Sequence, residues 1–153
     1  NETITISWFG DMNNVLYSFF EISNLLTNIK INVFTSDTIA NKCLPNFPKS
    51  KSVNFYNRLD RKIIGMSDCI MTDVYQSMND KEDHNKEQEL ITFQVNRELM
   101  NMTKEDCVFC HCLPAKTESE VTKEVIEGKK SIILEQAYNR MVVQKGILNW
   151  MFS

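Results

Sequence analysis

Short apolar runs along the chain predict buried β-strands. A strand that is covered on both faces of a parallel sheet appears in sequence as a continuous apolar, β-branched segment bounded by turn residues. Five such runs stand out, at residues 3–9, 29–34, 69–73, 106–111 and 131–134. Each is followed by a turn or a polar segment, and the fourth is followed closely by Pro114, which cannot continue a strand ladder.

Apolar residues spaced near 3.6 predict helices between these runs. The clearest helix covers residues 14–26, and either Asn13 or Asn14 can cap its start. Further helices are expected near residues 88–93, 97–102, 118–127 and 137–152, the third of these four ending at Gly128. Residues 36–62 look irregular, with one helical turn around 56–63, and the very polar residues 78–87 fit either a solvated loop or a mobile active-site loop.

Strands that alternate with helices predict one α/β domain over residues 1–153. We expect a three-layer, Rossmann-like arrangement with a parallel five-stranded sheet flanked by helices. In such folds ligands bind at the carboxyl ends of the strands. Polar segments follow the predicted strands at residues 10–14, 73–78, 111–114 and 135–140, so we expect the functional site where these four segments meet.

Composition and charge narrow the class of protein. The net charge of −3 provides no basic surface for nucleic acid or anionic lipid. No apolar run approaches the roughly 18 residues that a membrane span requires, and residues 1–4 lack the basic start of a signal peptide. The five cysteines are odd in number and three are crowded together, which fits reduced thiols in the cytoplasm better than a disulfide framework.

The crowded cysteines do not indicate a haem or zinc site. Cys107, Cys110 and His111 have the spacing of a c-type haem attachment or of half a zinc site. However, the segment has the pattern of a buried strand, and the only other histidine, His84, cannot supply a second ligand pair. We therefore interpret Cys107 and Cys110 as small buried apolar residues and expect no metal and no cofactor.

The segments after the strands carry groups suited to a small polar ligand. The Gly-Asp-Met-Asn-Asn turn at residues 10–14 lacks the glycines of a dinucleotide site, but its amides could bind a carboxylate or an amine. Asp73 could bind an ammonium group, and Arg140 could clamp a phosphate or a polarised carbonyl. His111 and Cys112 could polarise a carbonyl or orient an amine, and the Leu-Pro bond tolerates the cis isomer, which would turn the Leu113 carbonyl into a pocket. The alternative role for residues 10–14 is a helix cap, and that for Asp73 is a turn-stabilising carboxylate. The alternative for Arg140 is a surface salt bridge.

Taken together, these segments resemble the ornithine carbamoyltransferase branch of the aspartate/ornithine carbamoyltransferase family, in its second, ornithine-binding domain. His-Cys-Leu-Pro is the motif of that branch, and aspartate carbamoyltransferases carry proline in place of the cysteine. The matching segments are residues 7–15 (Ser-Trp-Phe-Gly-Asp-Met-Asn-Asn-Val), 72–78 (Thr-Asp-Val-Tyr-Gln-Ser-Met), 94–96, 99–100, 111–114 (His-Cys-Leu-Pro), 120–126 and 137–140 (Ala-Tyr-Asn-Arg).

The resemblance implies a role for each matching residue. Asn14, Asp73, Ser77 and Met78 would hold the α-amino and carboxylate groups of L-ornithine, and Cys112 with Asp73 would lie near its δ-amine. Arg140 and the Leu113 carbonyl would bind the carbamoyl group of carbamoyl phosphate, while His111 matches the motif without an assigned role. The catalytic candidates are therefore Cys112, Asp73 and Arg140. We also expect the Cys112 thiol, at the strand mouth, to react faster than Cys107 and Cys110.

Several positions depart from the family pattern. Met12 and Asn79 replace glycines, Tyr75 replaces tryptophan, and Gln136 and Tyr138 replace glutamates. The first domain's Ser-x-Arg-Thr-Arg phosphate cradle and His-Pro-x-Gln segment do not occur in these 153 residues, so we expect the chain alone to be inactive. Family members form homotrimers, mostly through that first domain, and their C-terminal helix packs back on it. Some apolar residues of the last helix should therefore be exposed here or be covered by another copy of the chain. The alternatives are a carbamoyltransferase for another amine, such as an N-acylornithine or putrescine, and a non-catalytic binding module derived from the fold.

Overall fold

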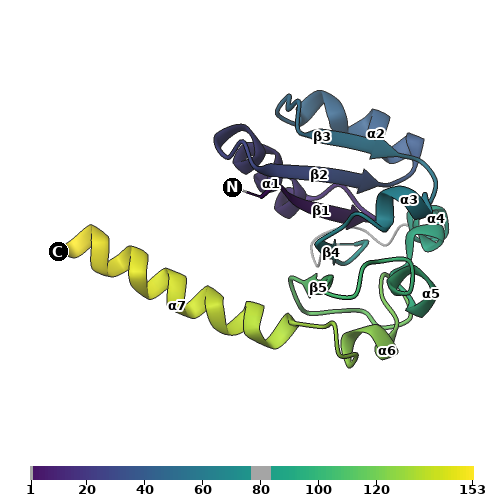
Figure 1. Ribbon diagram of the computed structural model, residues 1–153. Coiled ribbons are helices and arrows are strands. Elements are labelled where there is room, and N and C mark those ends of the chain that lie inside the picture. The colour runs from purple at the N-terminus through teal and green to yellow at the C-terminus, as the bar shows by residue number, and fades with distance from the viewer. Residues whose placement is uncertain (1, 77–83) are drawn as a thin grey trace.

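A computed structural model describes residues 2–76 and 84–153. Its centre is a five-stranded, all-parallel sheet, as the sequence predicts (Figure 1). The strand order is β3-β2-β1-β4-β5. The strands are β1 (Ile4–Phe9), β2 (Ile29–Phe34), β3 (Val53–Tyr56), β4 (Cys69–Thr72) and β5 (Val108–His111).

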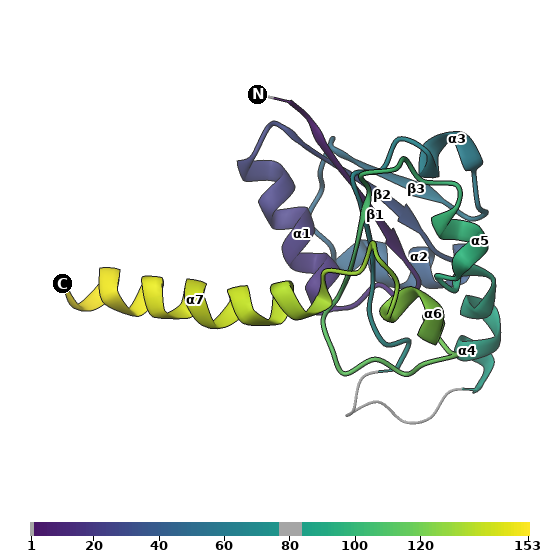
Figure 2. The ribbon, with the colours of Figure 1, turned by 60° about the horizontal axis from the view of Figure 1, so that its bottom comes forward.

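Helices flank both faces of this sheet. Figure 2 shows α1 on one face and α3 and α5 on the other, which is the arrangement that right-handed crossovers produce. The helices are α1 (Asn14–Leu25), α2 (Asp37–Cys43), α3 (Arg61–Ile64), α4 (His84–Leu90), α5 (Arg97–Met100), α6 (Lys123–Ile126) and α7 (Ile133–Phe152), with single 3₁₀ turns η1 (Leu44–Asn46) and η2 (Ile91–Phe93). The strand order reverses between β1 and β4, so the carboxyl ends of these two strands mark the expected ligand crevice.

Two predicted elements differ from the structure. Residues 131–134 are not a strand, because Ser131 makes one isolated bridge to Phe109 and α7 begins at Ile133. The fifth strand is instead β3, within the segment that looks irregular in sequence. The predicted helix at 118–127 shortens to α6, because Val121 pairs with Val95 and Glu118 takes a left-handed φ of 68°.

The core is aromatic and lies around the two central strands. Trp8 and Phe9 at the end of β1 are almost fully buried, and the Phe9 ring stacks on Phe34 of β2 with centroids 4.6 Å apart. Leu16 and Phe20 of α1 are buried as well. This packing fixes the ends of β1 and β2, and with them the turn that follows β1.

Helix α7 extends away from the rest of the domain (Figures 1 and 2). Most of its large apolar side chains are exposed, as expected for a helix that lacks a partner surface. The exposed apolar side chains are Leu134, Tyr138, Met141, Val142, Val143, Ile147, Leu148, Trp150, Met151 and Phe152. Among the described helices, none has the length and apolar character that would let it cross a membrane.

Candidate functional site

The turn after β1 is fixed by a glycine and a helix cap. Gly10 has a φ of +105°, and a Cβ atom there would lie 2.5 Å from Cε1 of Tyr75. Only glycine fits both the backbone conformation and this close contact. Three residues later Asn13 caps α1, because its Oδ1 accepts hydrogen bonds from the backbone N–H groups of Val15 and Leu16 at 3.0 and 3.1 Å.

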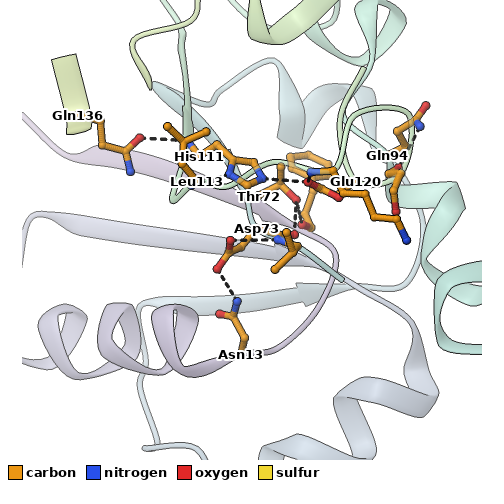
Figure 3. A network of polar contacts seen from close by, with 12 residues as sticks. Asn13, Thr72, Asp73, Gln94, His111, Leu113, Glu120 and Gln136 are labelled. Atoms are coloured by element: carbon orange, nitrogen blue, oxygen red, sulfur yellow. Dashed lines mark hydrogen bonds and ion pairs between the residues drawn. The ribbon is translucent and has the colours of Figure 1, made fainter. Parts of the chain in front are cut away.

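Asn13 also joins this turn to the end of β4. Its Nδ2 donates to Oδ2 of Asp73 at 2.7 Å, across 60 residues of sequence (Figure 3). The other Asp73 oxygen accepts from the backbone N–H of Val74 at 3.0 Å, and the residue is only 9% exposed. Thr72 Oγ1 donates to the Phe9 carbonyl at 2.7 Å, so the ends of β1 and β4 are tied twice. The Asp73 carboxylate is therefore held in one orientation before any ligand binds.

His111, at the end of β5, is held in one tautomer. The backbone N–H of Leu113 donates to Nδ1 at 2.9 Å, so this nitrogen carries no proton. Nε2 then carries the hydrogen and donates to Oε1 of Glu120 at 3.2 Å, with both side chains buried (Figure 3). The His111 backbone N–H donates to Oε1 of Gln136 at 3.0 Å, which ties β5 to α7. The Leu113–Pro114 bond is cis, and Leu113 has a left-handed φ of 53°.

Cys112 contacts Arg140 and lies within electrostatic reach of Asp73. Arg140 Nη2 donates to the Cys112 carbonyl at 3.1 Å. Burial raises the pKa of the Cys112 thiol to about 12, the Asp73 carboxylate adds to this rise, and Arg140 opposes it. Both charged groups therefore lie within electrostatic reach of the thiol, and Cys112 is a neutral thiol near pH 7.

The thiol chemistry argues against our expected order of cysteine reactivity. A hydrogen bond from Cys69 lowers the pKa of Cys110, whereas the pKa of Cys112 is raised. Reaction rate follows the thiolate fraction, so position at the strand mouth alone does not make Cys112 the fastest. Burial raises the pKa of Cys107, in agreement with its interpretation as a buried structural residue.

The structure brings together Asp73, Cys112, Leu113 and Arg140 from the ends of β4 and β5 and the first half of α7. Asn14 is exposed in the first turn of α1, and its neighbour Asn13 makes the contact with Asp73. Ser77 and Met78 lie outside the described residues, as does most of the polar run predicted at 78–87, which is helical from His84 onward.

Sequence patterns did not point to two side chains that hold residues in or near the site. Glu120 holds His111, and Lys86 of α4 forms an ion pair with Asp11 at 2.8 Å, near the β1–α1 turn. Neither contact follows from helical or strand periodicity, because both partners come from segments far apart or irregular. Within residues 2–76 and 84–153, no three His, Cys, Asp or Glu side chains gather as they would around a metal ion.

Comparison with known proteins agrees with this geometry. The family described as "Aspartate/ornithine carbamoyltransferase, Asp/Orn binding domain" matches residues 2–151. An ornithine carbamoyltransferase of Nitrobacter winogradskyi is 40% identical over 148 residues, which cover 95% of this chain and 48% of that protein. The chain thus spans about half the length of the curated relatives it matches.

Solved structures give the same result. The ornithine carbamoyltransferase of Burkholderia thailandensis superimposes with a TM-score of 0.83 at 26% identity, covering 97% of this chain and 47% of that one. The enzyme of Pyrococcus furiosus gives 0.79 at 29% identity, covering 96% and 49%. The chain belongs to the aspartate/ornithine carbamoyltransferase family and corresponds to its Asp/Orn binding domain.

Proposed function

We propose that this chain is the ornithine-binding half of an ornithine carbamoyltransferase. The observation that supports it most is the placement of Asp73, a buried carboxylate held by Asn13, within electrostatic reach of the neutral Cys112 thiol. A fixed carboxylate beside an uncharged thiol suits an amine nucleophile, because the carboxylate binds the ammonium form and can keep the released proton nearby. The relatives matched over nearly the whole chain are named as enzymes of this activity.

In the proposed reaction the neutral δ-amine of ornithine attacks the carbamoyl carbon of carbamoyl phosphate. A carbon–nitrogen bond forms, the bond from the carbamoyl carbon to the phosphate oxygen breaks, and citrulline and phosphate leave. Asp73 and Cys112 orient the amine, while Arg140 and the Leu113 carbonyl bind the carbamoyl group. The barrier falls through positioning and electrostatic stabilisation, without a covalent intermediate on the enzyme.

The remaining contacts to ornithine would come from Asn14, Ser77 and Met78, which we propose for its α-amino and carboxylate groups. His111 acts on the reaction only through the backbone that it holds. Its ring nitrogens are already occupied by Leu113 and Glu120, so it is poorly placed to exchange a proton with substrate.

Carbamoyl phosphate would bind jointly with a second domain that carries the phosphate cradle. The apolar side chains exposed along α7 supply a surface for that domain to cover, and we propose that the complete subunit assembles as a homotrimer in the cytoplasm. The five free thiols are consistent with that reducing compartment.

Binding of ornithine to the chain, measured by isothermal titration calorimetry, tests the first half of the proposal. We expect weak binding that Asp73→Asn abolishes. Asp37→Asn is the matched control, because Asp37 is an exposed carboxylate that follows β2 and hydrogen-bonds Asn57. Equal binding by the two variants would contradict the assignment of Asp73.

Citrulline production by the complete subunit tests the second half. Asp73→Asn should lower kcat by about 100-fold or more, a typical loss for a group that acts on a proton in the transition state. Faster turnover of putrescine or N-acetylornithine than of ornithine would move the assignment to another amine. Absence of any carbamoyl transfer would favour a binding module.

A further inference from the structure

A largely buried ion pair joins the β1–α1 turn, residues 10–14, to helix α4. Nζ of Lys86 lies 2.8 Å from Oδ2 of Asp11, and the two side chains are only 22% and 9% exposed. Taking a carboxylate out of water is costly unless an opposite charge balances it, and Lys86 supplies that charge. The proposed reaction uses neither residue, so the pair calls for a separate explanation.

Charge balance separates the roles of the two aspartates that follow β1 and β4. The Asp73 carboxylate accepts from neutral groups, the side-chain amide of Asn13 and the backbone N–H of Val74. Its negative charge is therefore not cancelled by these contacts and suits an ammonium group. The charge of Asp11 is instead balanced by Lys86. Asp11 thus connects the turn to α4, and Asp73 is the acid suited to bind the amine.

Asp11 and Asn13 lie two residues apart in the same short turn. Trp8 Nε1 donates to the Asp11 carbonyl at 2.8 Å, which restrains the turn from β1. The ion pair with Lys86 restrains the same residue from α4. Because so little chain separates the two residues, a displacement of Asp11 would also move Asn13, whose amide binds Asp73 at 2.7 Å.

Helix α4 also contacts the segment that follows β5. Glu87, the residue next to Lys86, pairs with Lys116, two residues after Pro114. The Lys116 side chain is 64% exposed, so water weakens this second ion pair. The firmer ionic contact of α4 is therefore the one to the β1–α1 turn.

We propose that Lys86 is a positioning residue that holds Asn13 in place through Asp11, so that Asn13 keeps Asp73 oriented for the amine. The consequence for ornithine rests on the proposed function, whereas the effect on the Asn13–Asp73 contact does not. The ion pair borders a cavity of about 260 Å³, so the larger guanidinium of an arginine at position 86 has room. Lys86→Arg should therefore preserve the arrangement.

NMR of the side-chain amide of Asn13 and ornithine titration of the chain test this proposal together. Lys86→Met keeps an unbranched apolar stem and removes the charge. It should shift the Asn13 amide signals, speed their hydrogen exchange and raise the Kd for ornithine about tenfold. Lys86→Arg should keep all three near their original values. Lys42→Met is the matched control, because it removes an exposed lysine that lines the same cavity and should change none of them.

Unaltered Asn13 signals in folded Lys86→Met would overturn the proposal and leave the ion pair as an anchor of α4 alone. Altered signals with an unaltered Kd for ornithine would overturn it too. Should Lys86→Met not fold, Asp11→Asn combined with Lys86→Met removes the lone buried charge and is judged by the same two results. A chain that does not bind ornithine at all contradicts the proposed function, and the Asn13 signals then decide this proposal by themselves.

Discussion

Asn13 gives the sharpest test of how the site is held together. Its side chain makes two separable contributions: Oδ1 caps α1, and Nδ2 binds the Asp73 carboxylate. Loss of a cap costs about 1 kcal/mol, and a hydrogen bond to a charged group contributes about 1.5–3 kcal/mol. Asn13→Ala should therefore lower the free energy of unfolding by about 3 kcal/mol. Asn14→Ala, one residue along and exposed, should change it by less than about 0.5 kcal/mol.

Exchanging the amide of Asn13 and the carboxylate of Asp73 separates the two contributions. Asn13→Asp keeps a capping oxygen but places a carboxylate against Asp73, so it should destabilise the chain as Asn13→Ala does or more. Adding Asp73→Asn reverses the donor and acceptor of the same contact. The amide introduced at the end of β4 can donate to the carboxylate introduced at the helix cap, while its oxygen still accepts from the Val74 N–H. The double variant should recover about 2 kcal/mol relative to Asn13→Asp, which is the value of a hydrogen bond to a charged group.

Urea unfolding followed by circular dichroism measures these free energies. The two substitutions should be coupled by at least about 1.5 kcal/mol, because residues in direct contact are not additive. Additivity within about 0.5 kcal/mol would refute the idea that Asn13 holds Asp73. Ornithine binding should not return in the double variant, since the carboxylate then sits on the β1–α1 turn instead of at the end of β4.

Three more predictions concern Gly10, Cys112 and the end of α7. Gly10→Ala should cost about 3 kcal/mol in urea unfolding, because the new Cβ meets the Tyr75 ring and the left-handed φ strains the backbone; a change under about 1 kcal/mol would contradict the close contact. The raised pKa of Cys112 should make the chain lose stability as pH rises from about 9 towards 12, because only the unfolded state is then deprotonated, and Cys112→Ala should lose less over that range. Removing residues 144–153 should change the unfolding free energy by less than about 0.5 kcal/mol, since their apolar side chains are exposed, but it should abolish assembly with a first domain if α7 docks there.

The central strands could be predicted because both of their faces are buried. β1, β2 and β4 therefore appear in sequence as largely apolar runs. β3 escaped prediction because it is a short edge strand that pairs only with β2 in the described structure, and each of its residues is half-buried. Its polar Asn54 and the preceding serine and lysine residues look like a loop. Residues 131–134 gave the opposite error. Their apolar run predicts a strand, but Ile133 and Leu134 begin α7.

Candidate site residues could be predicted only where they stand close together along the chain at the end of a predicted strand. His-Cys-Leu-Pro and Asp73 stand at or directly after strand ends, and that position, together with the family resemblance, makes them candidates. The contacts that hold these groups are long-range or fall where the predicted element is wrong. Asn13 meets Asp73 across 60 residues, and Glu120 reaches His111 from a turn before α6, in a segment whose spacing predicts a helix. Such contacts exist only after the sheet has brought the strand ends together, so spacing along the chain carries no signal for them.

The two ends of the proposed site differ in how firmly the domain holds them. Asp73 is buried, has both carboxylate oxygens bonded, and belongs to a sheet end that is tied to β1 by Thr72. Arg140 instead makes an exposed hydrogen bond from α7, a helix whose apolar side chains reach into solvent. The amine-binding end should therefore be preorganised in the chain alone, whereas the carbamoyl-binding end acquires a fixed Arg140 only when another surface covers α7. Ornithine affinity should then be nearly insensitive to Arg140→Ala in the chain, and carbamoyl transfer by the complete subunit should be strongly sensitive to it. Equal loss of ornithine binding from Arg140→Ala and Asp73→Asn in the chain would show instead that both ends are held together from the start.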